Sequence, residues 1–247
     1  DPPTYSPATP EDNLRTETVY DSVGNVIATI DANGIIARTY YDILNRPVTV
    51  VQNLQGQGIE ATTIPERGSS LSTSNLRTDT VYDANGNVIA AIDPLGIITR
   101  TYYDALNRPI TTVRNLHGQA ITVETPPAAG TGDENIRTDT YYDDLGRVIA
   151  SVDALGHVAR TYYDSAGRAV TTVRNLAGQD IYVNTPPGRT TGNTDQNIRT
   201  DTVYDAAGRR IATIDPSGRV TRYEYDSQGR SSATLVNYLE GQPQNYQ

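Results

Sequence analysis

The sequence predicts an all-β chain of tandem antiparallel β-hairpin or meander repeats that form a coiled β-sheet ribbon, either a superhelical solenoid or a hollow shell. Three observations support this prediction. A long unit recurs along the chain, similar turn signals recur about every ten residues inside that unit, and the stretches between turns are rich in Val, Ile, Thr and Tyr. A single compact enzyme domain is not expected from such a pattern.

The long unit begins with the motif Asn-Leu-Arg-Thr or Asn-Ile-Arg-Thr. It starts at Asn13, Asn75, Asn135 and Asn197, so the starts are 62, 60 and 62 residues apart. We therefore expect one continuous array with the tail of a preceding linker, three repeat units and an incomplete fourth unit, at residues 1–12, 13–74, 75–134, 135–196 and 197–247. Both ends fall inside units, so we expect a longer array around this window.

Inside a unit, a turn signal begins with Asp or Asn and has Gly or Asn at its fourth position. The second unit has four such signals, spaced by 10, 11 and 11 residues, at Asp83–Gly86, Asp93–Gly96, Asp104–Asn107 and Asn115–Gly118. An Asx side chain can bond its own backbone two residues on, and Gly or Asn can take a positive φ. This is the chemistry of a type I turn closed by a bulge, so each signal predicts a hairpin turn.

The stretches between these turns have strand composition and strand length. In the second unit they run over Asn87–Asp93, Ile97–Asp104 and Arg108–Asn115. With about five strands in each unit, the array would hold roughly 20 strands and would have to coil, because open twisted sheets rarely exceed about ten strands. Helices are not expected, since Gly, Pro and Asx interrupt the chain too often for a persistent apolar stripe.

Alternation along a strand predicts which side chains share a face of the sheet. In the third strand of the second unit, Arg100, Tyr102 and Asp104 lie on one face, and Ile97, Thr99, Thr101 and Tyr103 lie on the other. Neither set is strongly apolar, so we expect both faces of the ribbon to meet water. That pattern favours a hollow spiral or a fibre over a β-sandwich.

Each unit ends in a segment without a regular period. These segments are rich in Pro, Gly, Ser and Thr and lie at 62–74, 125–134 and 185–196. Because Pro cannot donate to a β-ladder, we expect loops that project from the sheet. The loops could carry O-linked sugar, whereas the chain has no Asn-x-Ser/Thr acceptor for N-linked sugar.

The eight Tyr-Asp pairs carry a resemblance to a known family. Each of them is followed by two residues and then Gly-Asn, Gly-Arg or Asn-Arg, and the step from Asp83 to Asp104 is 21 residues. This pattern resembles the YD or RHS repeat, whose signature is Tyr-Asp-x-x-Gly-Arg at a comparable spacing. The residues to which we assign this structural turn signature are Tyr20, Asp21, Gly24, Tyr82, Asp83, Gly86, Tyr103, Asp104, Tyr142, Asp143, Gly146, Tyr163, Asp164, Gly167, Tyr204, Asp205, Gly208, Tyr225, Asp226 and Gly229.

The resemblance implies a bacterial extracellular repeat protein, similar to the repeat shells of RHS and Tc toxins and to teneurins. Such repeats form a spiral β-sheet strip around a hollow shell that can enclose a C-terminal toxin or build a large extracellular domain. Two departures stand out: Asn-Leu-x-Gly-Gln, as at Asn115–Gln119, replaces a third Tyr-Asp pair, and each unit carries a Pro-rich loop. The inserted loops put a smooth closed shell in question.

Composition excludes several kinds of chemistry. The chain has no Cys, Met, Trp or Phe, and all 20 of its basic residues are Arg. Without Cys there is no thiolate metal site, disulfide or cysteine nucleophile. The formal net charge of −9 argues against a nucleic-acid partner and against attachment to anionic lipid. No apolar run approaches the roughly 20 residues of a membrane-spanning helix.

No residue pattern indicates a catalytic, cofactor or metal site. The run Asp83-Ala84-Asn85-Gly86-Asn87 has alternating oxygen ligands, but an EF-hand loop needs Glu at its twelfth position, which is Pro94 here. His117 and His157 occupy different positions in their units, and we expect both to be exposed turn residues. Turn chemistry explains the repeated Asp residues without a bound ion.

The arginines near the Tyr-Asp pairs admit two interpretations. These are Arg77, Arg100, Arg137, Arg160, Arg199 and Arg222. They could bind acidic glycans, or they could pair with carboxylates of strands and turns, and the acidic excess favours the second. The Tyr side chains could likewise bind extracellular carbohydrate or pack across strands, and cross-strand packing is the commoner outcome.

The function expected first is therefore structural and not enzymatic. The chain would be a building block of an extracellular or cell-surface filament or large assembly, with self-association along the array. The first alternative is a segment of an RHS or YD shell that encloses a toxin. The second alternative is a carbohydrate-binding surface module.

Overall fold

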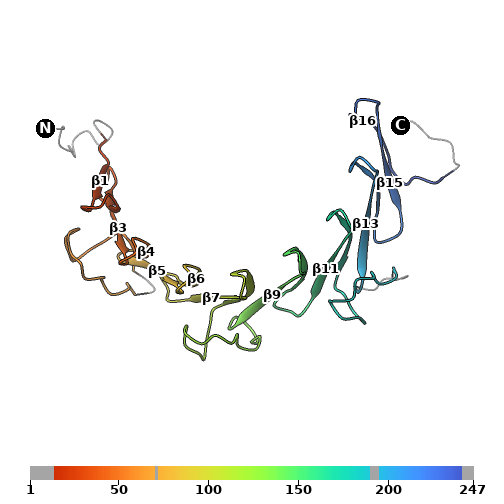
Figure 1. Ribbon diagram of the computed structural model, residues 1–247. Helices are drawn as coiled ribbons and strands as arrows, with labels where there is room; N and C mark the ends of the chain where they lie inside the picture. Colours follow the sequence, from red (N-terminus) through yellow and green to blue (C-terminus); the bar gives the residue numbers. More distant parts are fainter. Residues whose placement is uncertain (1–13, 70–71, 190–194, 241–247) are drawn as a thin grey trace. The chain divides into compact units, whose positions relative to one another are not determined.

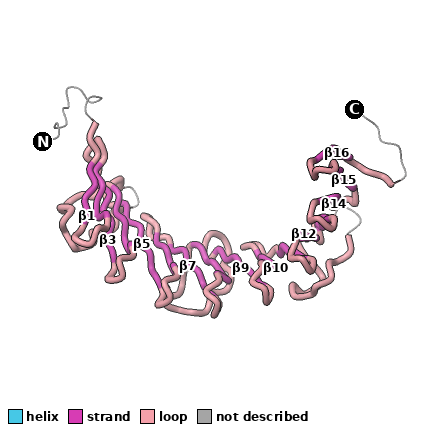
Figure 2. The backbone as a smooth tube through the Cα atoms, turned by 45° about the horizontal axis from the view of Figure 1, so that its top comes forward, coloured by secondary structure: helices cyan, strands magenta, loops and turns pink. Residues whose placement is uncertain are grey.

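The computed structural model describes residues 14–69, 72–189 and 195–240. The expected linker tail at 1–12 lies outside these residues, as do positions 70–71 and 190–194 of two expected loops. The described residues form strands, turns and loops without a helix, which confirms the all-β prediction (Figure 2). They accordingly include no helix of the length and hydropathy that a membrane crossing requires. The chain divides into two compact units, Asp1–Arg137 and Thr138–Gln247.

The first unit contains the strands of the first two repeats, which follow one another in chain order (Figure 1). They are β1 (Glu17–Tyr20), β2 (Val26–Ile30), β3 (Ile36–Tyr41), β4 (Pro47–Gln52), β5 (Leu76–Tyr82), β6 (Val88–Ile92), β7 (Ile98–Tyr103) and β8 (Pro109–Arg114).

The second unit contains the strands of the last two repeats, apart from the first residues of β9. They are β9 (Ile136–Tyr142), β10 (Val148–Val152), β11 (Val158–Tyr163), β12 (Ala169–Arg174), β13 (Ile198–Tyr204), β14 (Arg210–Ile214), β15 (Val220–Tyr225) and β16 (Ser231–Leu235).

Within each unit the sheet is an antiparallel meander in which every strand pairs with the next strand along the chain. The register shifts by one residue beside each Tyr-Asp turn, for example between Tyr102 and Tyr103 where β7 pairs with β8. The β6–β7 pair, which is joined by the turn at Asp93, has no such shift. The Tyr-Asp turns therefore lie beside bulges along one edge of the meander.

The expected five strands in each repeat are wrong, because each repeat has four strands and the described chain has sixteen. The stretch Ile121–Val123 has strand composition but lies in a loop. After β8 the backbone of Asn115 takes a φ of 52°, and the chain leaves the sheet instead of making a hairpin. The prediction of a hairpin turn at Asn115–Gly118 is therefore also wrong, since a local Asx signal does not decide whether a paired strand follows.

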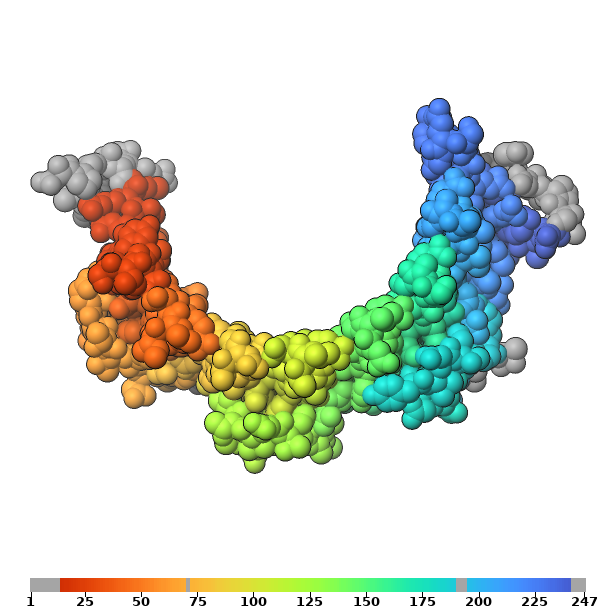
Figure 3. Space-filling view, viewed as in Figure 1, coloured from red at the N-terminus to blue at the C-terminus, as the bar shows by residue number. Residues whose placement is uncertain are grey.

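The loop that follows the fourth strand covers one face of the sheet. In the second repeat, Tyr102, Val113 and Leu116 form a small core with exposed fractions of 3%, 0% and 6%, and Ile98 and Ile121 pack against it. Corresponding cores contain Tyr40, Val51 and Leu54 in the first repeat and Tyr162, Val173 and Leu176 in the third. Figure 3 shows the loop of the second repeat, in yellow-green, as a block beside its strands.

The expectation that both faces meet water is accordingly wrong for the first three repeats. The face that carries Arg100 and Tyr102 is buried, because the loop packs on it. The described residues of the fourth repeat, which extend to 240, contribute nothing to the buried core. Among the described residues, a loop packed over the sheet thus distinguishes the first three repeats from the fourth.

Candidate functional site

The repeated Tyr-Asp turns have one geometry, which the turn at Asp104 illustrates. The amide of Asp104 donates to the carbonyl of Arg108 at 3.0 Å, and the amide of Asn107 donates back to the carbonyl of Asp104 at 3.0 Å. The Asp104 Oδ1 atom accepts the amides of Leu106 and Arg108, each at 2.9 Å. One carboxylate oxygen therefore caps two amides that the hairpin leaves without a backbone partner.

The structure places every signature aspartate at the first position of such a turn. The fourth position has a positive φ, which favours Gly or Asn. These φ values are 95° at Gly24, 90° at Gly86, 79° at Gly146, 79° at Gly167, 82° at Gly208 and 79° at Gly229. In the turns at Asp42 and Asp104, Asn45 and Asn107 take φ values of 60° and 58°.

The second oxygen of the carboxylate holds the arginine at the fifth position. Asp143 Oδ2 accepts Nε and Nη2 of Arg147, each at 2.7 Å. The same pairs join Asp42 to Arg46, Asp104 to Arg108, Asp164 to Arg168 and Asp205 to Arg209. The arginine that ends the signature is thus linked to its aspartate through side chains.

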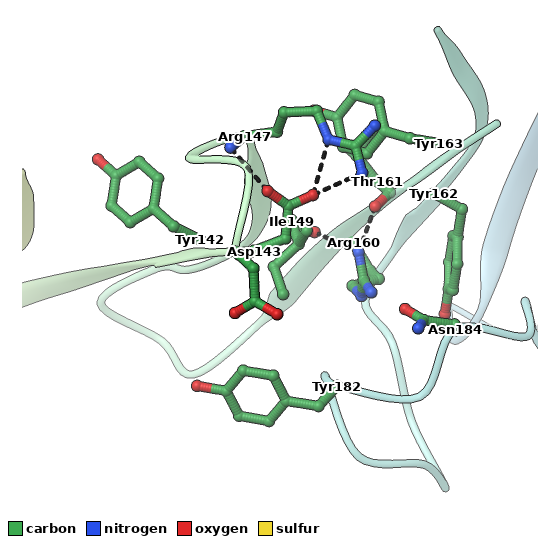
Figure 4. A pocket seen from close by; sticks show the side chains of 11 residues that line it. Tyr142, Asp143, Arg147, Ile149, Arg160, Thr161, Tyr162, Tyr163, Tyr182 and Asn184 are labelled. Atoms are coloured by element: carbon green, nitrogen blue, oxygen red, sulfur yellow. Dashed lines mark hydrogen bonds and ion pairs between the residues drawn. The ribbon is translucent and has the colours of Figure 1, made fainter. Parts of the chain in front are cut away.

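The held guanidinium lies over the tyrosine of the next Tyr-Asp turn, as Figure 4 shows for Arg147 and Tyr163. The guanidinium carbon is 4.5 Å from that ring centroid, and Arg168 lies 4.8 Å from Tyr204 in the next step. Arg46 over Tyr82 and Arg209 over Tyr225 repeat the contact at 4.4 and 4.9 Å. We call this series the Asp–Arg–Tyr ladder, and it connects each turn that has this arginine contact with the turn that follows.

Several tyrosines of the Tyr-Asp turns are also fixed through their hydroxyl groups. Tyr163 donates to the carbonyl of Val148 at 2.8 Å, and Tyr225 donates to the carbonyl of Arg210 at 2.9 Å. The equivalent bonds of Tyr41, Tyr82 and Tyr103 reach Val26, Pro47 and Val88. The rings of Tyr82, Tyr163 and Tyr225 therefore have a cation on the face and a backbone acceptor at the edge, which is the pairing that a partly buried tyrosine prefers.

The fourth-position glycine is favoured by its positive φ, and it lies next to the guanidinium held by the preceding turn. A Cβ atom on Gly167 would lie 3.7 Å from Nη1 of Arg147, and one on Gly208 would lie 3.8 Å from Nη1 of Arg168. A longer side chain there would displace the guanidinium from the tyrosine.

The first two repeats have a second arrangement. Asparagine replaces the arginine of one turn and the fourth-position glycine of the next turn. Asn87 occupies the arginine position, and its Nδ2 donates to Asp83 Oδ2 at 2.8 Å and to Asn107 Oδ1 at 2.9 Å. Asn25 similarly donates to Asp21 at 2.9 Å and to Asn45 at 3.1 Å. The short amide leaves room for Asn at the next fourth position, so the two substitutions occur together.

The hydrogen bonds lower the pKa values of the turn aspartates. The amide of Arg108 and then its side chain hold the pKa of Asp104 below its ordinary value, and the amide of Arg168 acts in the same way on Asp164. At Asp215 the hydroxyl of Ser217, together with Arg219, lowers the pKa to about 2. These carboxylates are therefore ionised in the folded chain at neutral pH.

The buried arginines of the third strands do not pair with carboxylates of the described residues, contrary to our expectation for Arg100 and Arg160. Both are buried, and each lies 4.5 Å over the tyrosine two residues further on. Their Nη1 atoms donate to the carbonyls of Ile89 and Ile149 at 2.9 and 3.0 Å. Their Nε atoms donate to the loop carbonyls of Ile121 and Ile181 at 2.8 and 2.6 Å. Backbone carbonyls thus replace the carboxylates that we expected.

The expectation of ion pairs holds for other arginines. Arg77 and Arg199 pair with Asp79 and Asp201 at 2.8 Å. Arg137 donates to the carbonyl of Pro127, and Arg222 lies 3.7 Å from Glu224. In the first repeat, the buried Nε of Arg38 has no hydrogen-bond partner in the structure.

The Asn-Leu-x-Gly-Gln segment, which the sequence led us to interpret as a hairpin turn and as a departure from the family, fixes the loop. Leu116 enters the core, and Gln119 donates through Nε2 to the hydroxyl of the buried Tyr102 at 2.7 Å. Gln57 and Gln179 make the same bond to Tyr40 and Tyr162. The recurrence of Leu and Gln at one spacing in three repeats was the available signal.

The histidines are exposed, as expected. His157 occupies the arginine position of the turn at Asp153, with 3.0 Å between its Nδ1 and Asp153 Oδ2. His117 lies 3.5 Å from Glu134. No group of three or more His, Asp or Glu side chains suited to a metal ion occurs among the described residues.

These features define a class of protein, a tandem β-meander array whose turns are joined by side-chain ladders. A sequence model of the RHS repeat family matches residues 82–120, 142–179 and 204–238, which fall in the second, third and fourth repeats. These three segments of the chain are RHS repeats.

Two solved structures share the fold over 90% of this chain. One is a crystal structure of TcdB2-TccC3, with a TM-score of 0.60 and 19% identity. The other is a Photorhabdus luminescens Tc holotoxin pore with a TccC3 mutation, with a TM-score of 0.58 and 20% identity. The match covers 10% of each of those chains, and this identity shows the fold alone. No curated protein matches the sequence.

Proposed function

We propose that this chain is a segment of the wall of a hollow RHS repeat shell that encloses another polypeptide. The observation that carries the proposal is the shared fold over 90% of the chain with TcdB2-TccC3 and with a Tc holotoxin pore, together with the three RHS repeat matches. In this role the chain is structural and not an enzyme.

The construction of the repeat supports such a wall. Each strand pairs with its sequence neighbour, so the meander can grow by adding repeats without changing earlier pairings. The inherent twist of β-sheet makes a long ribbon of this kind coil. The Asp–Arg–Tyr ladder ties successive turns along one edge, which would stiffen the ribbon.

The filament that we expected first has less support, because repetition alone favours it and both matched structures favour the shell. An extracellular or cell-surface location and self-association along the array, which we expected together with the filament, also stay proposals. The carbohydrate-binding alternative has no observation of its own, since the ladder tyrosines are occupied by arginine.

Limited proteolysis of the full-length native protein tests the shell. If the array encloses a polypeptide, mass spectrometry will find one contiguous segment that resists cleavage until urea opens the shell. Cleavage of every non-repeat segment at the same rate before and after urea treatment would contradict the proposal.

A further inference from the structure

The third repeat contains a pocket of about 420 Å³ that the function of the wall does not use. It lies between the turn that follows β9 and the loop that follows β12 (Figure 4). Its lining includes Tyr142, Asp144, Tyr182 and Asn184, with the buried Arg160 and Tyr162. This volume is within the range of small-ligand sites.

Three side chains are peculiar to the third repeat: two of them line this pocket, and the third contacts one of these two. Tyr141, Asp144 and Tyr182 replace smaller or differently charged residues of the other repeats. Tyr141 stands where they have Val19, Val81 and Val203; Asp144 stands where they have Ser22, Ala84 and Ala206; and Tyr182 stands where the first two have Glu60 and Thr122. Repeat architecture does not require any of the three, because the other repeats form the same strands without them.

The two tyrosines support each other. Tyr182 is 61% exposed, and its ring meets the ring of Tyr141 edge to face, with centroids 6.2 Å apart and an interplanar angle of 87°. An aromatic pair of this geometry is attractive beyond the area that it buries. Tyr141 therefore anchors an exposed aromatic ring at the pocket.

Asp144 differs from its neighbour Asp143. Asp143 holds Arg147 through its Oδ2 and accepts turn amides through its Oδ1. Asp144 is exposed and has no hydrogen bond or ion pair among the residues that the structure describes. The pocket thus combines an anchored phenol ring with a carboxylate that lacks a cation.

We propose that this pocket binds the guanidinium group of an arginine side chain from another polypeptide segment. The chain itself repeatedly places a guanidinium over a tyrosine ring and beside an aspartate, as in Asp164–Arg168–Tyr204. Tyr182 and Asp144 supply the tyrosine and the aspartate of that arrangement, and the guanidinium is the missing member. The net charge of −9 also favours a basic partner.

The test adds the peptide acetyl-Gly-Arg-Gly-amide to the full chain. Two-dimensional NMR of the chain detects binding of the peptide. Binding should shift the amide signals of the residues around Asp144 and Tyr182. The same peptide with citrulline, which is neutral and nearly isosteric, should bind about three- to tenfold more weakly, as expected for loss of a cation–π contact and an exposed ion pair.

Two variants and one control locate the site. Asp144→Asn and Tyr182→Thr should each weaken binding of the arginine peptide about three- to tenfold. Tyr182→Thr adopts the residue of the second repeat and should fold. Glu124→Gln removes an exposed carboxylate elsewhere and should leave binding unchanged.

Equal binding of the arginine and citrulline peptides, or equal binding by wild type and both variants, would overturn the proposal. So would shifts at Tyr182 produced by a neutral oligosaccharide such as cellotriose but not by the arginine peptide. The proposal goes beyond the wall function and does not depend on it, because these results do not require an enclosed cargo.

Discussion

Each turn aspartate has two separate tasks. Asp164 Oδ1 accepts the amides of Ala166 and Arg168, and its Oδ2 holds the Arg168 side chain. The first task is local and was predictable from the Asx-x-x-Gly pattern. The second positions Arg168 over Tyr204, which is far away in sequence, and no spacing rule for a turn could reveal that partner.

The paired asparagines lead to a prediction about Gly167. Replacing Gly167 with Asn should destabilise the chain by about 1 kcal/mol, because the new side chain would push Arg147 from Tyr163. Adding Arg147→Asn should recover much of this loss, since the pair then matches Asn87 and Asn107. Urea denaturation of both single variants and the double variant measures the coupling. Strictly additive losses would show that the two positions do not share space as described.

At the scale of elements, the loop and the four strands form one packing unit. The alternation of residues correctly placed Arg100 and Tyr102 on one face of the sheet. Their polar atoms led us to expect that this face is exposed to solvent. The long apolar parts of these side chains are instead covered by the loop, and their polar atoms bond to the backbone and to Gln119. A loop that folds back cannot be inferred from the period of the strands.

The hydrogen bond from Gln119 to Tyr102, which holds the loop, gives a second prediction. Gln119→Ala should destabilise the docked loop by about 1 kcal/mol, because the Tyr102 hydroxyl loses a partner. Hydrogen exchange should quicken at the Leu116 amide, which donates to Ile98, while the amides of β6 keep their rates. Gln228→Ala, at an exposed turn, serves as the control. Unchanged exchange at Leu116 would mean that the glutamine does not hold the loop.

For the whole molecule, the repeated carboxylates predict sensitivity to acid. The pKa values of Asp104, Asp164, Asp205 and Asp226 are lowered by hydrogen bonds from the following Arg residues, and that of Asp215 falls to about 2. The unfolded chain therefore binds more protons than the folded chain at acidic pH. Stability should be fully present above pH about 4 and should be lost as the pH falls toward about 2.

Urea midpoints between pH 6 and pH 2.5 measure this loss. Asp164→Asn keeps an oxygen for the turn amides but removes the charge that holds Arg168. It should be less stable than wild type at pH 6, and the difference should shrink near pH 2.5. A constant difference across this range, or a wild-type midpoint that does not fall, would contradict the assigned role of the carboxylates.

The sequence predicted the four-fold repetition and the antiparallel strands because both follow from local turn chemistry and β-propensity. It overestimated the number of strands, since Ile121–Val123 has β-forming residues but packs as a loop. The coil of the ribbon was inferred from sheet twist, and it remains part of the proposed shell.

The most direct test of the shell is single-particle electron cryomicroscopy of the full-length native protein. The account predicts closed hollow particles whose wall is a coiled β-ribbon with strands about 4.8 Å apart, with density for a separate segment inside. Extended filaments with an axial repeat set by these units, and no enclosed volume, would contradict it.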